Sequence, residues 1–159
     1  MKEIQLTQGK VALVDDEDFE YLNQWKWYAH NHHGKFYATR SIRINGKKKT
    51  VRMHRVIVNN TNPKMHTDHQ NGDSLDNRRM NLRICTASEN CRNTKKYIHN
   101  TSGYKGVTWN KAVKKWVARI ELNKKRNHLG YFIDIKDAAH AYNEAAIKFH
   151  GAFAKLNEI

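Results

Sequence analysis

The chain has 159 residues, and its 29 Lys and Arg against 15 Asp and Glu give a formal net charge of +14. Such an excess favours a polyanion as the partner and argues against a neutral metabolic enzyme. No segment approaches the ~18 consecutive apolar residues of a membrane span, and none near the N-terminus is typical of a signal peptide, so we expect a cytoplasmic protein without a membrane partner.

The basic residues are concentrated after residue 34. Residues 1–30 hold six acidic and three basic side chains, whereas Lys35 to Arg55 hold eight basic side chains and no acidic one. In the first part, Val11–Val14 predicts a buried strand, and Trp25 and Trp27 are expected in the core. Two alternating runs, 36–44 and 50–56, flank Asn45-Gly46, which is a strong two-residue turn signal. The sequence predicts a cation-rich β-hairpin here; the alternative for its lysine run is an ordinary solvated face.

Residues 59–83 are polar and contain the densest cluster of Asp, His and Asn in the chain. Long ordered loops in small domains tend to be functional. Thr86 and Glu89 have the spacing of a capping box, which predicts a helix from Thr86 with Asn90 in its first turns. The two cysteines, Cys85 and Cys91, form no CxxC pair, so we expect both to be reduced and no structural zinc.

The pattern restarts after Gly103 with three strand-like runs, at about 104–109, 115–122 and 126–132, followed by a helix at about 135–149. Asp134 can cap this helix and Gly151 can end it. The helical spacing predicts four side chains packed against the sheet: Ala138, Tyr142, Ala145 and Phe149.

The run from Thr67 to Arg83 contains Asp68-His69 and then Asn81 twelve residues on, with Asn90 nine residues further. It resembles the signature of the HNH nucleases of the ββα-metal class, particularly the phage and prophage group whose third signature position is Asn. His54-Arg55 also resembles the usual lead-in of that group. The resemblance covers nearly all of residues 3–97.

Phosphodiester hydrolysis requires a base for water and a means of stabilising the departing 3′ oxygen. His69 suits the first role as a neutral imidazole. Asp68 and Asn90 offer oxygen ligands to one divalent cation, Mg²⁺ or Mn²⁺. Adjacent strand residues point to opposite faces, so Asp68 and His69 can both serve only if the strand ends there, and the Gln70-Asn71-Gly72 turn provides that end. His66 is expected to be a bystander.

The resemblance implies that Asn81 ties the loop backbone together and does not touch substrate. Arg79 and Arg83 are candidates for binding DNA phosphate; the alternative is that they pair with the loop's own aspartates, Asp73 or Asp76. His54 either helps to position the site or packs behind it. An ordinary polar loop is the alternative for the whole cluster.

The runs 102–109, 115–120, 128–132 and 151–157 resemble the Apetala/ethylene-response DNA-binding domain over about 103–157. In that family a three-stranded antiparallel sheet, backed by a helix, lies in the major groove. Strand alternation predicts that Trp116, Ala118 and Ile120 face the helix and that Val117 faces out. Carried over by position, the outward-facing DNA-binding candidates are Lys105, Thr108, Trp109, Lys114, Arg119, Glu121, Arg126, His128 and Tyr131. For each, the alternative is an ordinary exposed strand residue, and base preference cannot be transferred because this chain differs from the plant domains at several of these positions.

We therefore predict an α+β chain with an N-terminal ββα-metal HNH nuclease domain (1–97), a linker (98–102) and a C-terminal domain (103–159) with a three-stranded antiparallel sheet packed on one helix. The expected function is a metal-dependent DNA endonuclease of the homing or mobile-element type, bacterial or phage-encoded and acting on double-stranded DNA. The sequence allows both a nickase and a double-strand cutter, and leaves the oligomeric state open. The alternatives are a non-catalytic DNA-binding regulator on an HNH scaffold and an RNA-binding protein.

Overall fold

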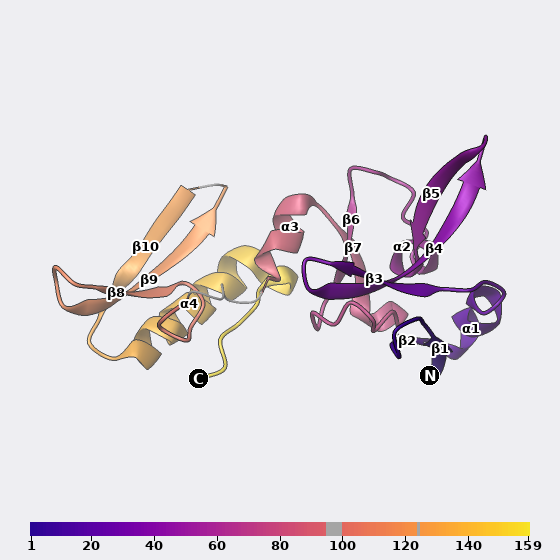
Figure 1. Cartoon of the computed structure of the whole chain (residues 1–159). Helices are drawn as coiled ribbons and strands as arrows, with labels where there is room; N and C mark the ends of the chain where they lie inside the picture. Colours follow the sequence, from indigo (N-terminus) through magenta and orange to yellow (C-terminus); the bar gives the residue numbers. More distant parts are fainter. Residues whose placement is uncertain (95–99, 124) are drawn as a thin grey trace. The chain divides into compact units, whose positions relative to one another are not determined.

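The computed structural model describes residues 1–94, 100–123 and 125–159, which form two compact units, Met1–Asn90 and Cys91–Ile159 (Figure 1). The chain is α+β, with small antiparallel sheets and four α-helices among the described residues. No helix in these described ranges is long and apolar enough to cross a membrane. Of the predicted linker 98–102, residues 98 and 99 lie outside the described residues. Asn100 and Ser102 form a turn closed by hydrogen bonds to the Tyr104 carbonyl, of 2.7 and 2.9 Å.

Unit 1 consists of three small sheets and short helices. Its elements in chain order are β1 (Lys2–Gln5), β2 (Val11–Val14), α1 (Asp16–Leu22), β3 (Tyr28–His32), β4 (Lys35–Ile44), β5 (Lys47–Arg52), α2 (Met53–Ile57), β6 (His66–His69), the 3-10 turn η1 (Arg79–Asn81), β7 (Leu82–Cys85) and α3 (Ala87–Arg92), whose last two residues belong to unit 2. The strands pair β1–β2, β3–β4–β5 and β6–β7, all antiparallel.

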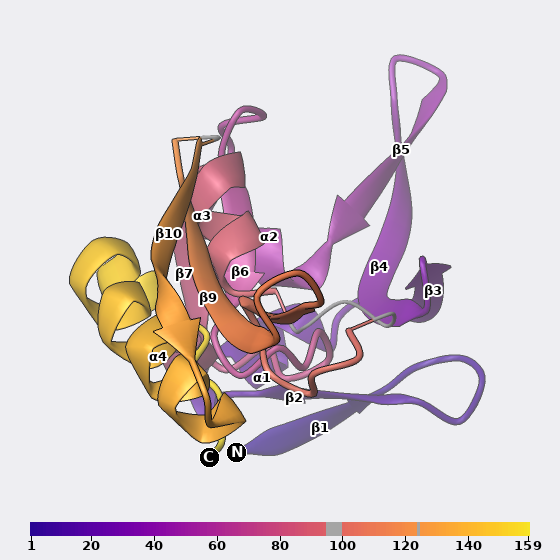
Figure 2. The same ribbon diagram turned by 90° about the vertical axis from the view of Figure 1, so that its left-hand side faces the viewer.

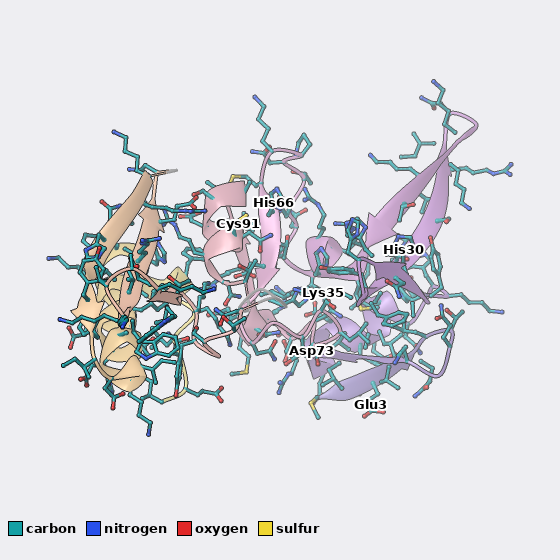
Figure 3. The ribbon with its side chains drawn as sticks, turned by 60° about the vertical axis from the view of Figure 1, so that its left-hand side comes forward. Glu3, His30, Lys35, His66, Asp73 and Cys91 are labelled. Atoms are coloured by element: carbon teal, nitrogen blue, oxygen red, sulfur yellow. The ribbon has the colours of Figure 1, made fainter. Side chains whose placement is uncertain are left out.

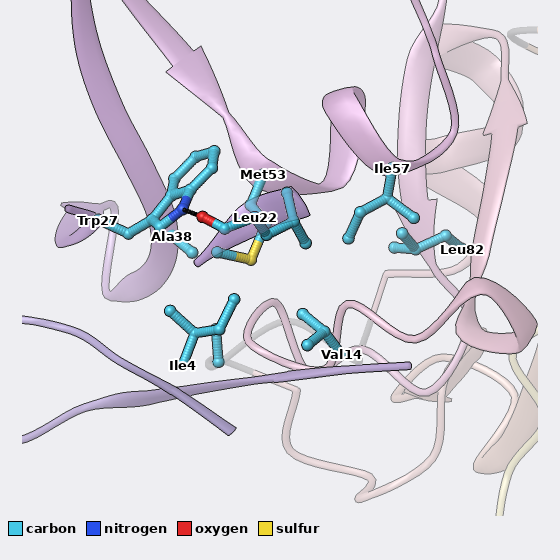
Figure 4. Close-up of a cluster of buried hydrophobic side chains, with 9 residues drawn as sticks. Ile4, Val14, Leu22, Trp27, Ala38, Met53, Ile57 and Leu82 are labelled. Carbon is cyan, nitrogen blue, oxygen red and sulfur yellow. Dashed lines mark hydrogen bonds between the residues drawn. The ribbon is translucent and has the colours of Figure 1, made fainter. Parts of the chain in front are cut away.

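The core of unit 1 lies between these elements (Figure 4). Val14, Leu22 and Met53 are fully buried, and Trp27 is 4% exposed with its indole Nε1 donating to the Leu22 carbonyl at 2.8 Å. The predicted core position of Trp27 is confirmed. Of the predicted buried run Val11–Val14, Ala12 and Val14 are buried, whereas Val11 and Leu13 are partly exposed. Trp25 packs against the same core while partly exposed.

The predicted hairpin is confirmed as β4–β5. Asn45 and Gly46 both have left-handed φ values, 50° and 74°, as a two-residue turn requires. The second strand was expected to run to residue 56, but β5 ends at Arg52 and α2 follows. Met53 and Ile57 are four residues apart and both buried, so burial of one helical face in the core favours a helix here.

Unit 2 has the sheet order β10–β9–β8, formed by β8 (Val107–Asn110), β9 (Lys115–Leu122) and β10 (Lys125–Phe132). Helix α4 (Ile135–His150) packs on it, and η2 (Gly151–Phe153) follows. The Asp134 carboxylate caps α4 by accepting a hydrogen bond from the Lys136 amide at 2.6 Å, as predicted.

The helix–sheet contact depends on small side chains. Ala138, Tyr142 and Ala145 are buried as predicted, but Phe149 is 43% exposed. The buried stripe instead continues from Tyr142 through Ala146 to His150, because residues four apart follow one face of the helix. Gly106, with φ of 76°, brings the chain before β8 onto α4; a Cβ there would collide with the Tyr142 ring and lie 2.7 Å from the Arg119 carbonyl. Only glycine fits this position.

Candidate functional site

The signature residues lie on a strand, a loop, a second strand and a helix in succession. β6 pairs with β7 with Asp68 opposite Arg83 and His69 opposite Leu82. β6 ends at His69, where the Gly72 amide bonds the His69 carbonyl at 2.9 Å and Gly72 has φ of 81°. The strand therefore ends at the turn that the sequence predicts.

Helix α3 begins with the predicted capping box. The Glu89 amide donates to Thr86 Oγ1 at 3.2 Å, and the Thr86 amide donates to Glu89 Oε2 at 2.8 Å. Asn90 lies one residue further along the helix, and its Nδ2 is 3.4 Å from His66 Nδ1. Because His66 and Asp68 are two residues apart on β6, they share one face of the strand. His66, expected to be a bystander, is thus the β6 side chain in contact with Asn90.

His69 is 6% exposed and lies beside two other rings. Its Nε2 is 3.3 Å from Asn77 Oδ1, and its ring centroid is 5.1 Å from His54, edge to face, and 6.3 Å from Tyr37. Burial lowers the pKa of His69 below its ordinary value, and the hydrogen bond to Asn77 opposes this shift. The imidazole is therefore neutral near pH 7.

His54, in the first turn of α2, is 3% exposed and lies edge to face with Tyr37 at 5.7 Å. Burial, followed by the charges of His69 and Arg52, lowers the pKa of His54 to about 3. His54 therefore supplies a neutral ring that contacts His69.

Asp68 is 6% exposed, and its Oδ2 accepts hydrogen bonds from Arg83 Nε at 2.8 Å and Nη2 at 2.6 Å. Arg83 thus pairs with an aspartate, although not with Asp73 or Asp76 as the sequence analysis had considered. This partner follows from the β6–β7 register, which places the two residues opposite each other.

The oxygen donors predicted for a metal are Asp68 and Asn90, of the chemical type that Mg²⁺ prefers. With the Asn90 amide nitrogen directed at His66, the amide oxygen is the end suited to a cation. Across the described ranges, no group of three or more His, Cys, Asp or Glu side chains could hold a metal ion. A cation here would therefore have few protein ligands, and at Asp68 it would meet a carboxylate already bonded to Arg83.

The loop between β6 and β7 is braced by Asn81. Its Nδ2 donates to the Asp76 carbonyl at 2.7 Å, and its Oδ1 accepts from the Asn71 amide at 2.9 Å. The Gln70 amide also donates to the Asn81 carbonyl at 2.8 Å. The Asn81 side chain thus bonds the loop backbone near its start and at its middle, in line with the loop-tying role that the resemblance implies.

Arg79, predicted to bind phosphate or a loop aspartate, is instead held by α1. Its guanidinium bonds Asp18 at 2.8 and 2.7 Å and Glu17 at 2.8 Å, and its amide donates to Asp15 Oδ2 at 2.7 Å. It is Arg78 that pairs with Asp76, at 2.7 Å. The acidic residues 15–18 therefore fix the loop at Arg79. They also bond the guanidinium of Arg79, which was expected to bind DNA phosphate.

Two residues that contact His69, Asn77 and Tyr37, were not predicted from the sequence. Neither were the hydrogen bonds that join the backbone of β2 to the loop. The Leu13 amide donates to the Leu75 carbonyl at 2.9 Å, and the Asn77 amide donates to the Leu13 carbonyl at 2.8 Å. Asn77 lies beside Asp76 in a run of polar residues and carried no separate signal. Its identity as a His69 partner requires the folded loop.

In unit 2, strand register divides the predicted DNA-binding residues between two faces. Residues directly opposite each other in an antiparallel pair share a face. Three cross-strand sets therefore lie on the face away from α4: Thr108–Val117–Tyr131, Arg119–His128 and Glu121–Arg126. A register shift between His128 and Gly130 keeps His128 and Tyr131 on one face, with ring centroids 4.6 Å apart.

Three of the predicted outward residues are placed differently. Trp109 is paired with Trp116, with ring centroids 5.1 Å apart, and so lies on the α4 side, because adjacent residues Thr108 and Trp109 cannot face the same way. Lys114 lies in the turn before β9, with φ of 51°. Lys105 is half-buried, and its Nζ donates to the Arg92 and Thr94 carbonyls at 2.6 and 2.8 Å. Burial lowers the pKa of Lys105 to about 8.

Val117 lies on the face away from α4, as predicted, but its side chain is fully buried. Its cross-strand neighbours Thr108 and Tyr131 flank it on both sides. The centre of this face is thus apolar and covered, while Arg119 and Arg126 are exposed around it.

No family model matches the chain. It is 31% identical over 91 residues to "Protein 3.8" of Escherichia phage T7, and the alignment covers 57% of this chain and 74% of that protein. The chain therefore belongs to the same family as Protein 3.8.

Proposed function

We propose that the chain is a metal-dependent DNA endonuclease of the HNH class, with phosphodiester hydrolysis in unit 1. The observation that supports this most is the strand–loop–strand–helix arrangement, in which Asp68 and His69 end β6 and Asn90 lies on the following α3. The net charge of +14 fits a nucleic-acid substrate. The relative from phage T7 is consistent with a phage or prophage origin.

His69 is the proposed general base. Since Asn77 Oδ1 can only accept, the hydrogen bond between them is donated by His69 Nε2, and Nδ1 is the basic nitrogen that takes a proton from water. A Mg²⁺ ion held by Asp68 and Asn90 would supply charge neutralisation at the scissile phosphate and the departing 3′ oxygen. Arg83 fixes the Asp68 carboxylate, and Asn81 fixes the loop that carries Asn77.

A non-catalytic DNA-binding regulator is the second candidate. The observation that favours it is the Arg83–Asp68 pair, because an arginine that neutralises the proposed metal ligand can replace the cation with a permanent structural contact. The two candidates differ in one result. Supercoiled and linear DNA are incubated with the protein and Mg²⁺, Mn²⁺ or EDTA; metal-dependent nicks or breaks support the endonuclease, and binding without cleavage in every metal supports the regulator.

We further propose that unit 2 reads DNA through the outer face of β8–β10, with Arg119, Arg126, His128 and Tyr131 as base-edge or phosphate contacts. The exposed cations and the paired His128 and Tyr131 rings support this. A fragment starting at Cys91 retains the Lys105 contacts to Arg92 and Thr94 and tests the proposal in a salt-series binding assay. A folded fragment that binds no DNA at low salt would exclude unit 2 as the reader.

A further inference from the structure

The hairpin β4–β5 projects from the rest of unit 1 and has two chemically distinct faces (Figures 1 and 2). The register pairs Thr39 with Arg52, Ser41 with Thr50 and Arg43 with Lys48. Because side chains alternate along a strand, these six residues share one face, which also includes Tyr37. We call this the site face. The opposite face carries Arg40 with Val51, Ile42 with Lys49 and Ile44 with Lys47.

The site face begins at the candidate catalytic base. The Tyr37 ring centroid is 6.3 Å from that of His69, and the Arg52 guanidinium lies over the Tyr37 ring at 5.4 Å. Beyond Arg52 come the hydroxyls of Ser41 and Thr50, and then Arg43 and Lys48 at the tip. A track of cations and hydroxyls therefore leads outward from His69.

At the base of the hairpin, the opposite face packs against the core of unit 1. Ala38 is buried, and the Arg40 guanidinium stacks on Trp25 at 3.9 Å and on Trp27 at 5.5 Å. Towards the tip this face presents Ile42, Ile44, Lys47 and Lys49. Only the site face thus combines cations with a direct path to His69.

No ion pair within the described part of the chain neutralises the tip of the hairpin. The stretch from Lys35 to Arg55 contains no acidic residue, and none of the described residues forms an ion pair with Arg43 or Lys48. Figure 3 shows long side chains extending from the tip. An exposed, projecting row of unpaired cations is complementary to a polyanion.

We propose that the site face of β4–β5 binds double-stranded DNA adjacent to the scissile phosphate, as a two-stranded ribbon in a groove. This rests on the endonuclease function proposed above. The seven residues from Tyr37 to Arg43 span ~20 Å at the rise of a β-strand, or ~6 base pairs of duplex. A two-stranded ribbon fits the major groove of B-DNA.

The hairpin itself offers a matched control. Arg43→Ala with Lys48→Ala removes two cations from the site face, whereas Lys47→Ala with Lys49→Ala removes two cations from the opposite face of the same tip. Both double variants have the same net charge. A difference between them therefore reports on the face and not on overall electrostatics.

Binding is measured in EDTA on a duplex of about 30 base pairs over about 50 to 200 mM salt, and cleavage is measured separately with Mg²⁺. The site-face variant is expected to bind about tenfold more weakly at low salt, with a salt slope smaller by about two, while the control keeps most of the wild-type affinity. Cleavage by the site-face variant should fall in parallel at subsaturating DNA and recover at saturation.

Equal affinities for the two double variants, with wild-type binding and cleavage intact, would overturn the hairpin proposal and leave the endonuclease function standing. Absence of both DNA binding and cleavage in the wild type would overturn the function itself. A site-face effect on duplex RNA that is absent on duplex DNA would also overturn the proposal, because the partner would then be RNA. Thermal unfolding of both variants shows that the comparison is between folded proteins.

Discussion

The buried imidazole of His54 makes the stability of unit 1 depend on pH. Its pKa is about 3 in the folded protein, against an ordinary value of 6.5, because burial disfavours the charged ring. The unfolded chain therefore binds a proton below pH 6.5 that the folded chain does not accept until about pH 3. The folded state is therefore most stable above pH 6.5, and its stability falls as the pH drops towards 3.

Substituting His54→Gln removes this titration. Each pH unit below the unfolded pKa costs ~1.4 kcal/mol, so the wild type loses ~2 kcal/mol between about pH 7.5 and about pH 5 through this one group. The folded imidazole is still neutral at about pH 5, so the loss of stability at that pH is set by the pKa of His54 in the unfolded chain alone. The variant should lose ~2 kcal/mol less over the same interval, whatever its stability near neutral pH.

Hydrogen exchange of peptides from α2 and β6 in increasing urea measures this at both pH values and reports on unit 1 separately from unit 2. His30→Gln is the control, since His30 of β3 is exposed in the fold (labelled in Figure 3). Its pH dependence should match that of the wild type. An identical stability loss in His54→Gln and wild type would show that His54 is protonated equally in both states, and the burial argument would fail.

Three further outcomes are expected. His69→Ala should abolish strand cleavage and leave DNA affinity within a few-fold, as measured by parallel cleavage and binding assays; equal loss of both would make His69 structural. Asp68→Ala or Asn90→Ala should lower cleavage and raise the Mg²⁺ concentration required, and metal-independent cutting by either variant would rule out the ligand assignment. Gly106→Ala should destabilise unit 2 by ~1–3 kcal/mol in denaturant unfolding, since its φ is left-handed and a Cβ collides with Tyr142; an unchanged midpoint would contradict the close approach.

The elements that sequence predicted well are those set by local chemistry. The Asn45-Gly46 turn needs left-handed residues, the Thr86–Glu89 capping box satisfies orphan amides, and Asp134 caps α4. Each signal lies within four residues of the structure it dictates. No tertiary information is needed to read them.

The errors concern register and long-range pairing. Residues 59–83 were interpreted mainly as a loop, with a strand end at Asp68-His69 but no partner strand, so the β6–β7 pairing and the Asp68–Arg83 contact could not be anticipated. Trp109 was placed outward beside Thr108, against the alternation of the strand. Arg79 binds Asp18, 61 residues away, and nothing local marks such a partner.

The ion pairs give a structural role to the uneven distribution of charge, in which acidic residues are concentrated in residues 1–30 and basic residues in 35–55. In the described residues, four of the six acids in the first 30 residues form ion pairs: Asp16 with the N-terminus, Glu20 with Lys2, and Glu17 and Asp18 with Arg79. They are used to assemble the scaffold around the candidate site and do not neutralise the β4–β5 hairpin. The acidic start thus helps to fix the loop that contains Asn77 and Asn81. It leaves the positive charge of the β4–β5 hairpin uncompensated, which under the proposed function is the charge that attracts the DNA substrate towards His69.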